Sequence, residues 1–276
     1  MTIDLHCHSK HSDGELSPTE LIALAQRNGA TMISITDHDT VSAYEDLPTT
    51  FELCLLPGVE FSCLWRNTNV HIVGLGIDPT AKNLRVSCSI QSEHRMTRAR
   101  VIADRLFSKR VVPSAEDALI AVSEIAGTRA IGRPDFADYL VRTGVCEDRA
   151  SAFKSYLGAG KVGDVKEQWP DMKEVIKWIG DAGGVAVWAH PAKYKMTRSK
   201  LISMIREFRE YGGESIEVCA GHQTDQVTKS IADLSKSFDL SASCGSDFHS
   251  LDRQWSQVGK VRTLPSNCRP VWEKWI

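Results

Sequence analysis

Short apolar runs alternate with helical stretches along the first half of the chain. Residues 3–5, 31–35 and 53–56 each have the length and composition of a buried strand. Between the first two, Ser17-Pro18-Thr19-Glu20 predicts the start of a helix, with serine as N-cap, proline at the first helical position and glutamate completing a capping box. Strands separated by helices favour a parallel sheet, so the pattern predicts an α/β fold.

The alternation continues with a hairpin and a long helix, and it resumes near the end of the chain. Residues 61–64 and 70–75 flank the polar turn Asn67-Thr68-Asn69 and predict a hairpin, and residues 91–109 predict a long helix with several arginines. Beyond residue 171, helices are predicted at 172–181, 198–211 and 224–238, and strands at 185–189, 215–218 and 241–244. About seven strand–helix units predict a distorted seven-stranded (β/α)7 TIM-like barrel, with its chemistry at the carboxyl ends of the strands.

The strand pattern is interrupted between residues 113 and 170. Glycines such as Gly127, Gly132 and Gly144 divide this segment into short predicted helices. We therefore expect a small helical subdomain inserted into the barrel. The predicted organisation is a first part of the barrel at 1–112, the insertion at 113–170, and a second part with a C-terminal tail at 171–276.

Composition and charge narrow the possible functions. The chain has 276 residues, 42% of them hydrophobic, with a formal charge of -2 and a pI near 6.5. This balance argues against a basic face for long duplex nucleic acid, although a local basic pocket for a mononucleotide or a short strand remains allowed. No apolar run approaches the roughly 20 residues of a membrane span. Because residues 1–6 also lack the features of a signal peptide, we expect a cytoplasmic protein.

Histidines and carboxylates fall at the ends of the predicted strands. His6 and His8 follow the first strand and, two residues apart, project from the same face of an extended chain. Asp247 and His249 repeat this spacing after the last strand. A parallel barrel brings such positions to one rim. The full candidate set is His6, His8, Asp13, His38, Glu60, His71, His190, Asp247 and His249, with His11 as an alternative to Asp13.

This set predicts a metal centre. Imidazoles combined with carboxylates suit zinc, manganese or iron. Nine ligands are too many for one ion. At about three protein ligands per catalytic ion, which leaves positions open for water and substrate, two or three ions are expected.

The motifs around these residues resemble those of the polymerase and histidinol phosphatase (PHP) family. The resemblance runs from residue 4 to about residue 249, and the ordered set is highly specific. The motifs are Asp4-Leu5-His6-Cys7-His8-Ser9, Ser12-Asp13-Gly14, Thr36-Asp37-His38, Pro57-Gly58-Val59-Glu60, Val70-His71-Ile72-Val73-Gly74, Ala189-His190-Pro191 and Gly245-Ser246-Asp247-Phe248-His249.

The resemblance implies a metal-dependent phosphoesterase with about three divalent ions per chain, manganese being favoured over zinc or iron. Carried over by position, the first ion would be held by His6, His8, Glu60 and Asp247, the second by Glu60, His71 and His190, and the third by Asp13, His38 and His249. Glu60 would then be the bridging carboxylate. Asp13 and His38 are candidates for the general acid only if they are not committed to metal.

Further motifs are similar to a bacterial branch of the family that includes 3',5'-nucleoside bisphosphate phosphatases and the 5'-to-3' exoribonuclease ribonuclease AM. They include Ile131-Gly132-Arg133-Pro134 and Leu264-Pro265. This similarity implies hydrolysis of the 3'-phosphate of nucleoside bisphosphates, or degradation of short 5'-phosphorylated RNA. The branch usually has histidine where this chain has Asp135, and a carboxylate there would repel a phosphate.

Basic residues must hold the phosphate that is not cut. Arg95 and Arg98 are three residues apart on the predicted long helix and share one face, and their forked donors suit a phosphate. Arg133 and Lys161, both in the predicted insertion, are further candidates for substrate binding.

Two rival functions use the same sequence features. A phosphatase for another small metabolite, such as histidinol phosphate, would need the same metals but no site for a nucleobase. A non-catalytic metal-binding accessory module, the form that some PHP domains take in polymerases, typically loses ligands. All nine positions are filled in this chain, so the accessory module is the less favoured hypothesis.

Overall fold

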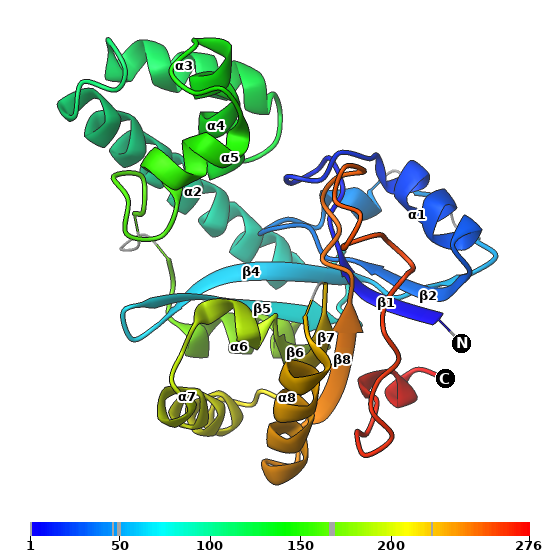
Figure 1. The fold of residues 1–276 in the computed structure, drawn as a ribbon. Coiled ribbons are helices and arrows are strands. Elements are labelled where there is room, and N and C mark those ends of the chain that lie inside the picture. Colours follow the sequence, from blue (N-terminus) through cyan, green and yellow to red (C-terminus); the bar gives the residue numbers. More distant parts are fainter. Residues whose placement is uncertain (1, 46, 49–50, 166–168, 222) are drawn as a thin grey trace. The chain divides into compact units, whose positions relative to one another are not determined.

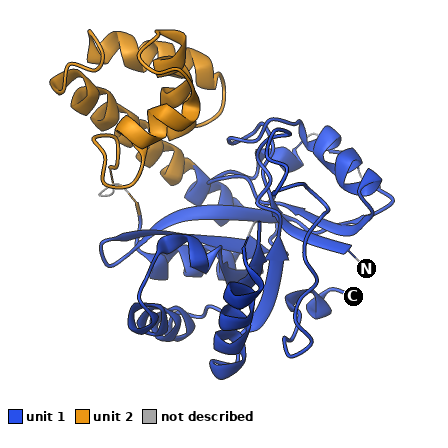
Figure 2. Ribbon diagram, in the orientation of Figure 1, with its two compact units in different colours: residues 1–88, 170–276 blue, residues 89–169 orange. Residues whose placement is uncertain are grey.

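The structure is a computed structural model that describes residues 2–45, 47–48, 51–165, 169–221 and 223–276. The chain divides into two compact units (Figure 2). The first comprises Met1–Cys88 and Pro170–Ile276, and the second comprises Ser89–Trp169. The second unit therefore begins earlier than the predicted insertion at residue 113, and it includes most of the long arginine-rich helix.

Eight strands in the described residues form two sheets (Figure 1). Parallel strands β1 (Thr2–Cys7), β2 (Ala30–Ile35) and β3 (Cys54–Leu55) form the first sheet. The second contains β4 (Gly58–Trp65), β5 (Thr68–Leu75), β6 (Val185–Trp188), β7 (Ser215–Ala220) and β8 (Ser241–Gly245), in that order. The α/β class is confirmed, and so is the hairpin, since β4 pairs antiparallel with β5.

Strand pairing among the described residues does not close the predicted seven-stranded barrel. Strand β5 is antiparallel to both of its neighbours, which makes the second sheet mixed. Strand β3 has only two residues, because Pro57 follows shortly and cannot donate a ladder hydrogen bond. Isolated parallel bridges, Cys7 with Phe248 and His38 with Glu60, nevertheless join segments of the two sheets near the carboxyl ends of β1 and β2.

Helices in the first unit follow the sequence pattern closely. They are α1 (Pro18–Arg27), α6 (Met172–Asp181), α7 (Arg198–Glu210), α8 (Asp225–Ser237) and short 3-10 turns at Ser42–Tyr44, Pro191–Tyr194 and Val271–Lys274. The predicted capping box is present, because Ser17 N–H donates to Glu20 Oε2 at 2.9 Å and Glu20 N–H donates back to Ser17 Oγ at 3.4 Å. Helix α6 packs against β4, β5 and β6, and α8 against β7 and β8.

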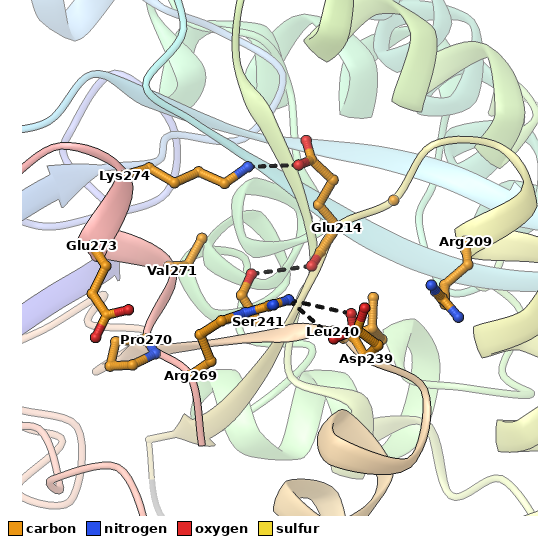
Figure 3. Close-up of a pocket in the computed structure, with 11 residues that line it drawn as sticks. Arg209, Glu214, Asp239, Leu240, Ser241, Arg269, Pro270, Val271, Glu273 and Lys274 are labelled. Carbon is orange, nitrogen blue, oxygen red and sulfur yellow. Dashed lines mark hydrogen bonds and ion pairs between the residues drawn. The ribbon is translucent and has the colours of Figure 1, made fainter. Parts of the chain in front are cut away.

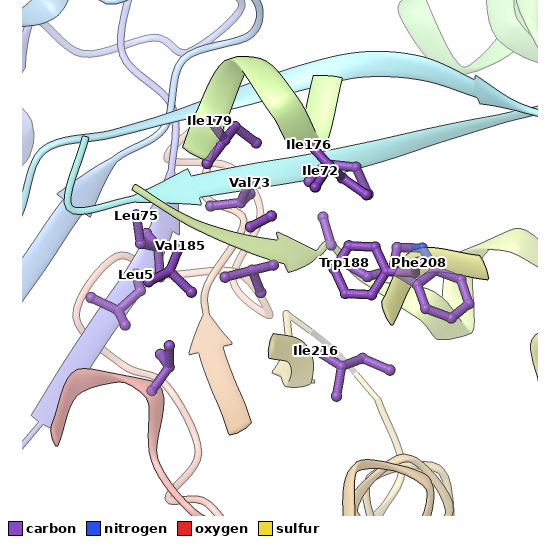
Figure 4. Close-up of a cluster of buried hydrophobic side chains, with 14 of the residues drawn as sticks. Leu5, Ile72, Val73, Leu75, Ile176, Ile179, Val185, Trp188, Phe208 and Ile216 are labelled. Atoms are coloured by element: carbon purple, nitrogen blue, oxygen red, sulfur yellow. The ribbon is translucent and has the colours of Figure 1, made fainter. Parts of the chain in front are cut away.

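An apolar core holds the strands of the first unit together (Figure 4). It includes Leu5 of β1, Ile72 of β5, Trp188 of β6 and Phe208 of α7, all fully buried. Burying each side chain contributes about 1.5–3 kcal/mol to stability. Because neighbours along a strand point to opposite faces, Leu5 enters this core while His6 points to the other side.

The second unit is helical and has its own core. Helix α2 (Lys82–Ser108) begins in the first unit and continues into the second. The second unit also contains α3 (Ala115–Ala126), α4 (Arg133–Arg142), α5 (Arg149–Ala152) and a short π-helix at Phe153–Leu157. Leu106, Val122, Phe136 and Leu140 are fully buried within it. In neither unit does a described helix combine the length and apolar character needed to cross a membrane.

Candidate metal centre

All nine predicted ligands lie in one constellation. They form four overlapping groups in which the possible ligand atoms lie within 4.8 Å of one another. The groups are His6 with His8 and Asp247; His6 with Glu60 and His190; His38 with Glu60 and His71; and His8 with Asp13, His38 and His249. His11 belongs to no group found among the described residues, so the geometry favours Asp13 over His11.

The carboxylate of Glu60 lies at the centre of this constellation. It projects from β4 and is fully buried. Its Oε1 lies 3.0 Å from His71 Nδ1 and 3.0 Å from His190 Nε2. Its Oε2 lies 3.3 Å from His6 Nε2, 3.4 Å from His8 Nε2 and 3.0 Å from His38 Nδ1. The two oxygens therefore face different sets of imidazoles.

Several buried polar atoms point into the centre without satisfying one another. Both ring nitrogens of His8, and Nε2 of His6, make no hydrogen bond of acceptable geometry to any described residue. The same holds for Glu60 Oε2. A buried polar atom without a partner costs about 1–3 kcal/mol, and so many in one place require an explanation. Bound divalent ions would explain these atoms, because imidazole nitrogens and carboxylate oxygens are the usual ligands of such ions. The donor set therefore fits a metal centre.

The protonation states of the imidazoles agree with this fit. Burial lowers the pKa of His71, His190 and His249 to about 4, so these rings are neutral near pH 7. Burial, helped by the neighbouring His249 and His38, holds the pKa of His8 well below its usual value. A neutral imidazole is the form that binds metal.

His6 and Glu60 form a charged pair within the centre. Burial lowers the pKa of His6, but the charges of Glu60 and Glu217 outweigh it and raise that pKa to about 10. Burial likewise raises the pKa of Glu60, while the charges of His6 and His38 outweigh it and hold that pKa well below its ordinary value. Glu60 is therefore ionised, which is the form in which a carboxylate binds metal.

Two ligands have left-handed backbone conformations, which residues other than glycine seldom adopt. His190 has φ 31° and Asp247 has φ 52°. Each peptide is held in place: His190 N–H donates to Glu217 Oε2 at 2.6 Å, and Asp247 N–H donates to the carbonyl of His6 at 2.7 Å. Nearby, Gly245 is required, because a Cβ there would lie 2.2 Å from His6 Cβ. The backbone conformation and its hydrogen bonds therefore fix the positions of these two residues.

Buried aspartates fix the loops that carry the ligands. Asp37 accepts bonds from Ser9 N–H at 2.7 Å and Ser12 Oγ at 2.6 Å, which orders the loop before Asp13. Asp39 accepts from Ser62 N–H at 2.7 Å, which connects the His38 loop to β4. Both aspartates flank His38 in the sequence, but no supporting role was predicted for either.

Glu217 in β7 is a further supporting residue that the sequence analysis missed. Its side chain is buried, and its Oε1 lies 3.1 Å from His6 Nδ1. Together with the bond from His190 N–H, this contact connects His6 in β1 with His190, which follows β6. The only signal in the sequence is one glutamate within the otherwise apolar or small run Ser215-Ile216-Glu217-Val218.

Glu217→Gln is expected to weaken metal binding by about 10- to 100-fold, because an amide orients His6 less firmly and makes it a weaker donor. Competition with a chromogenic chelator for Zn²⁺ or Mn²⁺ measures the change. Glu214→Gln is the control, since Glu214 lies just before the same strand and pairs with Lys274. Equal affinities in wild type and Glu217→Gln would exclude this supporting role.

The predicted substrate-binding residues belong to the helical unit. Arg95 and Arg98 are buried and both stack on Trp169, and Arg98 Nε also donates to the carbonyl of Val165 at 3.1 Å. Arg133 Nη1 donates to the carbonyl of Leu157 at 3.1 Å, and Lys161 is exposed. These arginines thus have structural contacts inside their own unit. Their role in substrate binding stays a prediction.

Asp135 does not present a free negative charge. It is fully buried at the start of α4, where its Oδ2 accepts bonds from Gly132 N–H at 2.7 Å and Arg129 Nη1 at 2.9 Å. Arg129 also pairs with the other oxygen. The repulsion expected from the sequence is therefore countered by Arg129.

A separate pocket lies at the amino ends of β7 and β8, whereas Asp247 of the metal centre follows the carboxyl end of β8 (Figure 3). It has a volume of about 440 Å³ and is lined by residues that include Glu214, Asp239, Arg269 and Lys274. Lys274 pairs with Glu214, and Arg269 with Asp239. Because four of its charged residues form these two ion pairs and no histidine is among its described lining residues, this pocket is not the candidate reaction site.

Comparison with known proteins agrees with the motifs and the geometry. The family model of the PHP domain matches residues 4–183. The chain belongs to the PHP family. It is 38% identical to a 5'-3' exoribonuclease of Haemophilus influenzae over 98% of each chain. It is also 36% identical to a 3',5'-nucleoside bisphosphate phosphatase of Chromobacterium violaceum, over 99% of this chain and 95% of the relative.

The fold of this PHP chain matches a solved structure as well. An amidohydrolase from Chromobacterium violaceum, solved with bound sulfate and no metal, superposes with a TM-score of 0.87 at 34% identity. The match covers 99% of this chain and 95% of that one. The family inferred from the sequence motifs is therefore confirmed.

Proposed function

We propose that this PHP chain is a metal-dependent phosphoesterase that removes the 3'-phosphate of 3',5'-nucleoside bisphosphates and degrades short 5'-phosphorylated RNA in the 5'-to-3' direction. Relatives with these two activities in their names align over nearly the full chain. A hydrolase also fits the complete set of nine ligand-type side chains, which disfavours a non-catalytic accessory module.

The two activities require the same bond to be cut. A nucleoside 3',5'-bisphosphate and the first nucleotide of a 5'-phosphorylated RNA both carry a 5'-phosphate and a phosphate ester at O3'. Hydrolysis of the O3'–phosphorus bond releases a nucleoside 5'-monophosphate in each case. The other product is inorganic phosphate from the bisphosphate, or an RNA that is one nucleotide shorter and again carries a 5'-phosphate. One site can therefore act repeatedly on RNA.

The central position of Glu60 is the observation that carries the proposal. Its oxygens face two sets of imidazoles at 3.0–3.4 Å, which is the arrangement that a carboxylate bridging two ions needs. We assign the remaining ligands as the resemblance implies, with His6, His8 and Asp247 on one side of Glu60 and His71 with His190 on the other. Asp13, His38 and His249 would hold a third ion.

Divalent ions bound there supply an activated water and neutralise the phosphate oxygens. The chain's own residues give this chemistry its geometry. Glu217 orients His6, and Asp37 orders the loop that carries Asp13. Lys193 pairs with Asp247 Oδ2, so a cation lies beside the centre, where the substrate carries negative charge.

The purified protein is expected to contain more than one equivalent of transition metal, and His6→Ala and Asp247→Ala should lose much of it. Each residue belongs to a ligand doublet that the fold holds in place. Elemental analysis measures the content, and His94→Ala is the matched control, because His94 belongs to no ligand group among the described residues. One equivalent or less in a fully active protein would exclude a multinuclear centre.

Manganese-loaded protein incubated with adenosine 3',5'-bisphosphate tests the activity directly. The expected products are adenosine 5'-monophosphate and inorganic phosphate, separated by ion-exchange chromatography. A screen of other phosphorylated metabolites, histidinol phosphate among them, runs beside it. Faster hydrolysis of a metabolite without a nucleobase would contradict the proposed substrate class while leaving the phosphoesterase chemistry intact.

A further inference from the structure

A run of basic residues follows the ligand His190 along the chain. From residue 190 to residue 206 there is no aspartate or glutamate, but there are five cations: Lys193, Lys195, Arg198, Lys200 and Arg206. The whole chain, by contrast, has a formal net charge of -2. The positive charge is therefore a property of this segment and not of the protein as a whole.

Contacts with three predicted ligands hold the beginning of this segment against the metal centre. The ammonium group of Lys193 pairs with Asp247 Oδ2. The next residue, Tyr194, accepts a hydrogen bond at its hydroxyl from His71 N–H at 2.9 Å. The ring centroid of Tyr194 also lies 5.4 Å from that of His190. The basic segment therefore starts at the centre itself.

The ligand beside this segment is also the most accessible one. The side chain of His71 is 28% exposed, whereas each of the other eight predicted ligands is at most 18% exposed. A substrate reaches a buried centre through the most accessible of its ligands. A polymer bound at the centre can thus continue past His71 and along the basic segment.

The far end of the segment lies at the tip of the β4–β5 hairpin (Figure 1). Lys200, in the first turn of α7, donates from Nζ to Thr68 Oγ1 at 2.9 Å and lies over the ring of Trp65. Thr68 is three residues from His71 along β5, which corresponds to roughly 10 Å. The segment is thus anchored at both ends, and both anchors belong to the same strand.

Two cations between these anchors are available to a ligand. Lys195 and Arg198 are exposed, and neither side chain makes a hydrogen bond or ion pair with any residue that the structure describes. Arg198 is also the first residue of α7, where a positive charge opposes the helix dipole and no acidic residue of the first turn offsets it. The described contacts therefore give neither charge a role in stabilising the fold.

We propose that the basic strip, which comprises Lys193, Lys195, Arg198 and Lys200, binds the phosphates of an RNA substrate that lie beyond the bond being cut. The inference rests on the proposed function and extends it to the body of the RNA. A nucleoside bisphosphate ends at the phosphate that is cut, whereas an RNA continues with one phosphate per nucleotide. Contacts to phosphates do not depend on base sequence, as an exoribonuclease that meets every sequence requires.

The double variant Lys195→Ala/Arg198→Ala tests the basic strip by turnover. The manganese-loaded protein hydrolyses 5'-phosphorylated RNAs, from a dinucleotide to an octanucleotide, beside adenosine 3',5'-bisphosphate. In the wild type, KM should fall as the RNA lengthens, because more phosphates reach the strip. In the double variant, the KM of the octanucleotide should rise about tenfold, while that of the bisphosphate should change by less than about twofold.

Equilibrium binding gives a second result that does not depend on turnover. The ligand is a 5'-phosphorylated octanucleotide in which a methylene group replaces the first O3', so that the first linkage is not cut. Its affinity for the manganese-loaded protein is measured at several salt concentrations. Each phosphate contact contributes about 0.7 to the slope of log affinity against log salt, so losing two contacts should reduce the slope by about 1.4.

Lys229→Ala/Lys236→Ala is the matched control. It removes two exposed lysines of α8 in the same unit and changes the net charge by the same amount. Metal content is measured for every variant. Unchanged KM and salt slope in Lys195→Ala/Arg198→Ala would overturn the inference, and so would equal losses in the control, since only net charge would then matter. An equal rise in KM for the bisphosphate and the octanucleotide would also overturn it.

A failure of the proposed function gives a different result from a failure of this inference. Without the proposed activity, the wild-type protein hydrolyses neither adenosine 3',5'-bisphosphate nor the RNAs. If only the inference is wrong, the wild-type protein hydrolyses both kinds of substrate, and the double variant has the same KM as the wild type for each.

Discussion

Glu60→Gln is expected to lower kcat by at least about a hundredfold while the fold is retained. Both carboxylate oxygens face imidazole nitrogens of the centre, Oε1 at 3.0 Å and Oε2 at 3.0–3.4 Å. Glutamine keeps one oxygen, and its amino group presents hydrogen atoms to the place that a cation needs. A loss of about 3 kcal/mol in transition-state stabilisation corresponds to more than a hundredfold in rate.

The measurement combines steady-state turnover with elemental analysis, so that loss of metal and loss of rate are separated. Circular dichroism checks the fold. Glu214→Gln is the matched control, because it removes a carboxylate outside the centre from the same unit. Wild-type turnover by Glu60→Gln at full metal content would show that Glu60 is not the bridging ligand.

Local rules of backbone geometry explain why so many residues of the metal centre could be predicted from the sequence. A residue pair two positions apart at a strand end projects to one side, so His6 with His8 and Asp247 with His249 could be recognised as doublets. A capping box is likewise complete within four residues, as at Ser17 and Glu20. Such features need no knowledge of the tertiary structure, and they placed nearly every element of the first unit.

Features that depend on contacts between distant segments could not be predicted in this way. Glu217 lies 211 residues from His6 in the sequence, and its role follows only from the fold. Barrel closure was another such inference, and the pairing of described strands gives two sheets instead. Strand β5 pairs antiparallel with β6, so the second sheet is mixed rather than fully parallel. No local sequence pattern indicates the relative direction of two strands that are so far apart in the chain.

The arginines illustrate the same difficulty for a binding site. Arg95 and Arg98 share a helix face, as predicted, but within their unit they lie against Trp169 and are buried. A long amphiphilic side chain can serve packing as well as charge, so helical spacing alone does not identify a phosphate site.

Adenosine 3',5'-bisphosphate is expected to be hydrolysed at the 3' position with a kcat/KM about a hundredfold higher than that of adenosine 3'-monophosphate. The two substrates present the same bond, and they differ only in the 5'-phosphate. Each charge-assisted hydrogen bond to that group contributes roughly 1.5–3 kcal/mol, so two such bonds from one guanidinium correspond to at least about a hundredfold. Initial rates at low substrate concentration measure both values.

The variants decide which arginine is responsible. Arg133→Ala should reduce the preference for the bisphosphate to within about tenfold, because one phosphate ligand is lost while metal content stays unchanged. Arg133→Ala tests the position inferred from sequence, where the guanidinium already bonds to the carbonyl of Leu157. A preference that disappears in Arg133→Ala and persists in Arg269→Ala, an arginine that pairs with Asp239 outside the metal centre, would assign phosphate recognition to the helical unit. Equal kcat/KM values in the wild-type protein would remove the need for a phosphate-binding arginine, since the 5'-phosphate would then contribute nothing to the reaction.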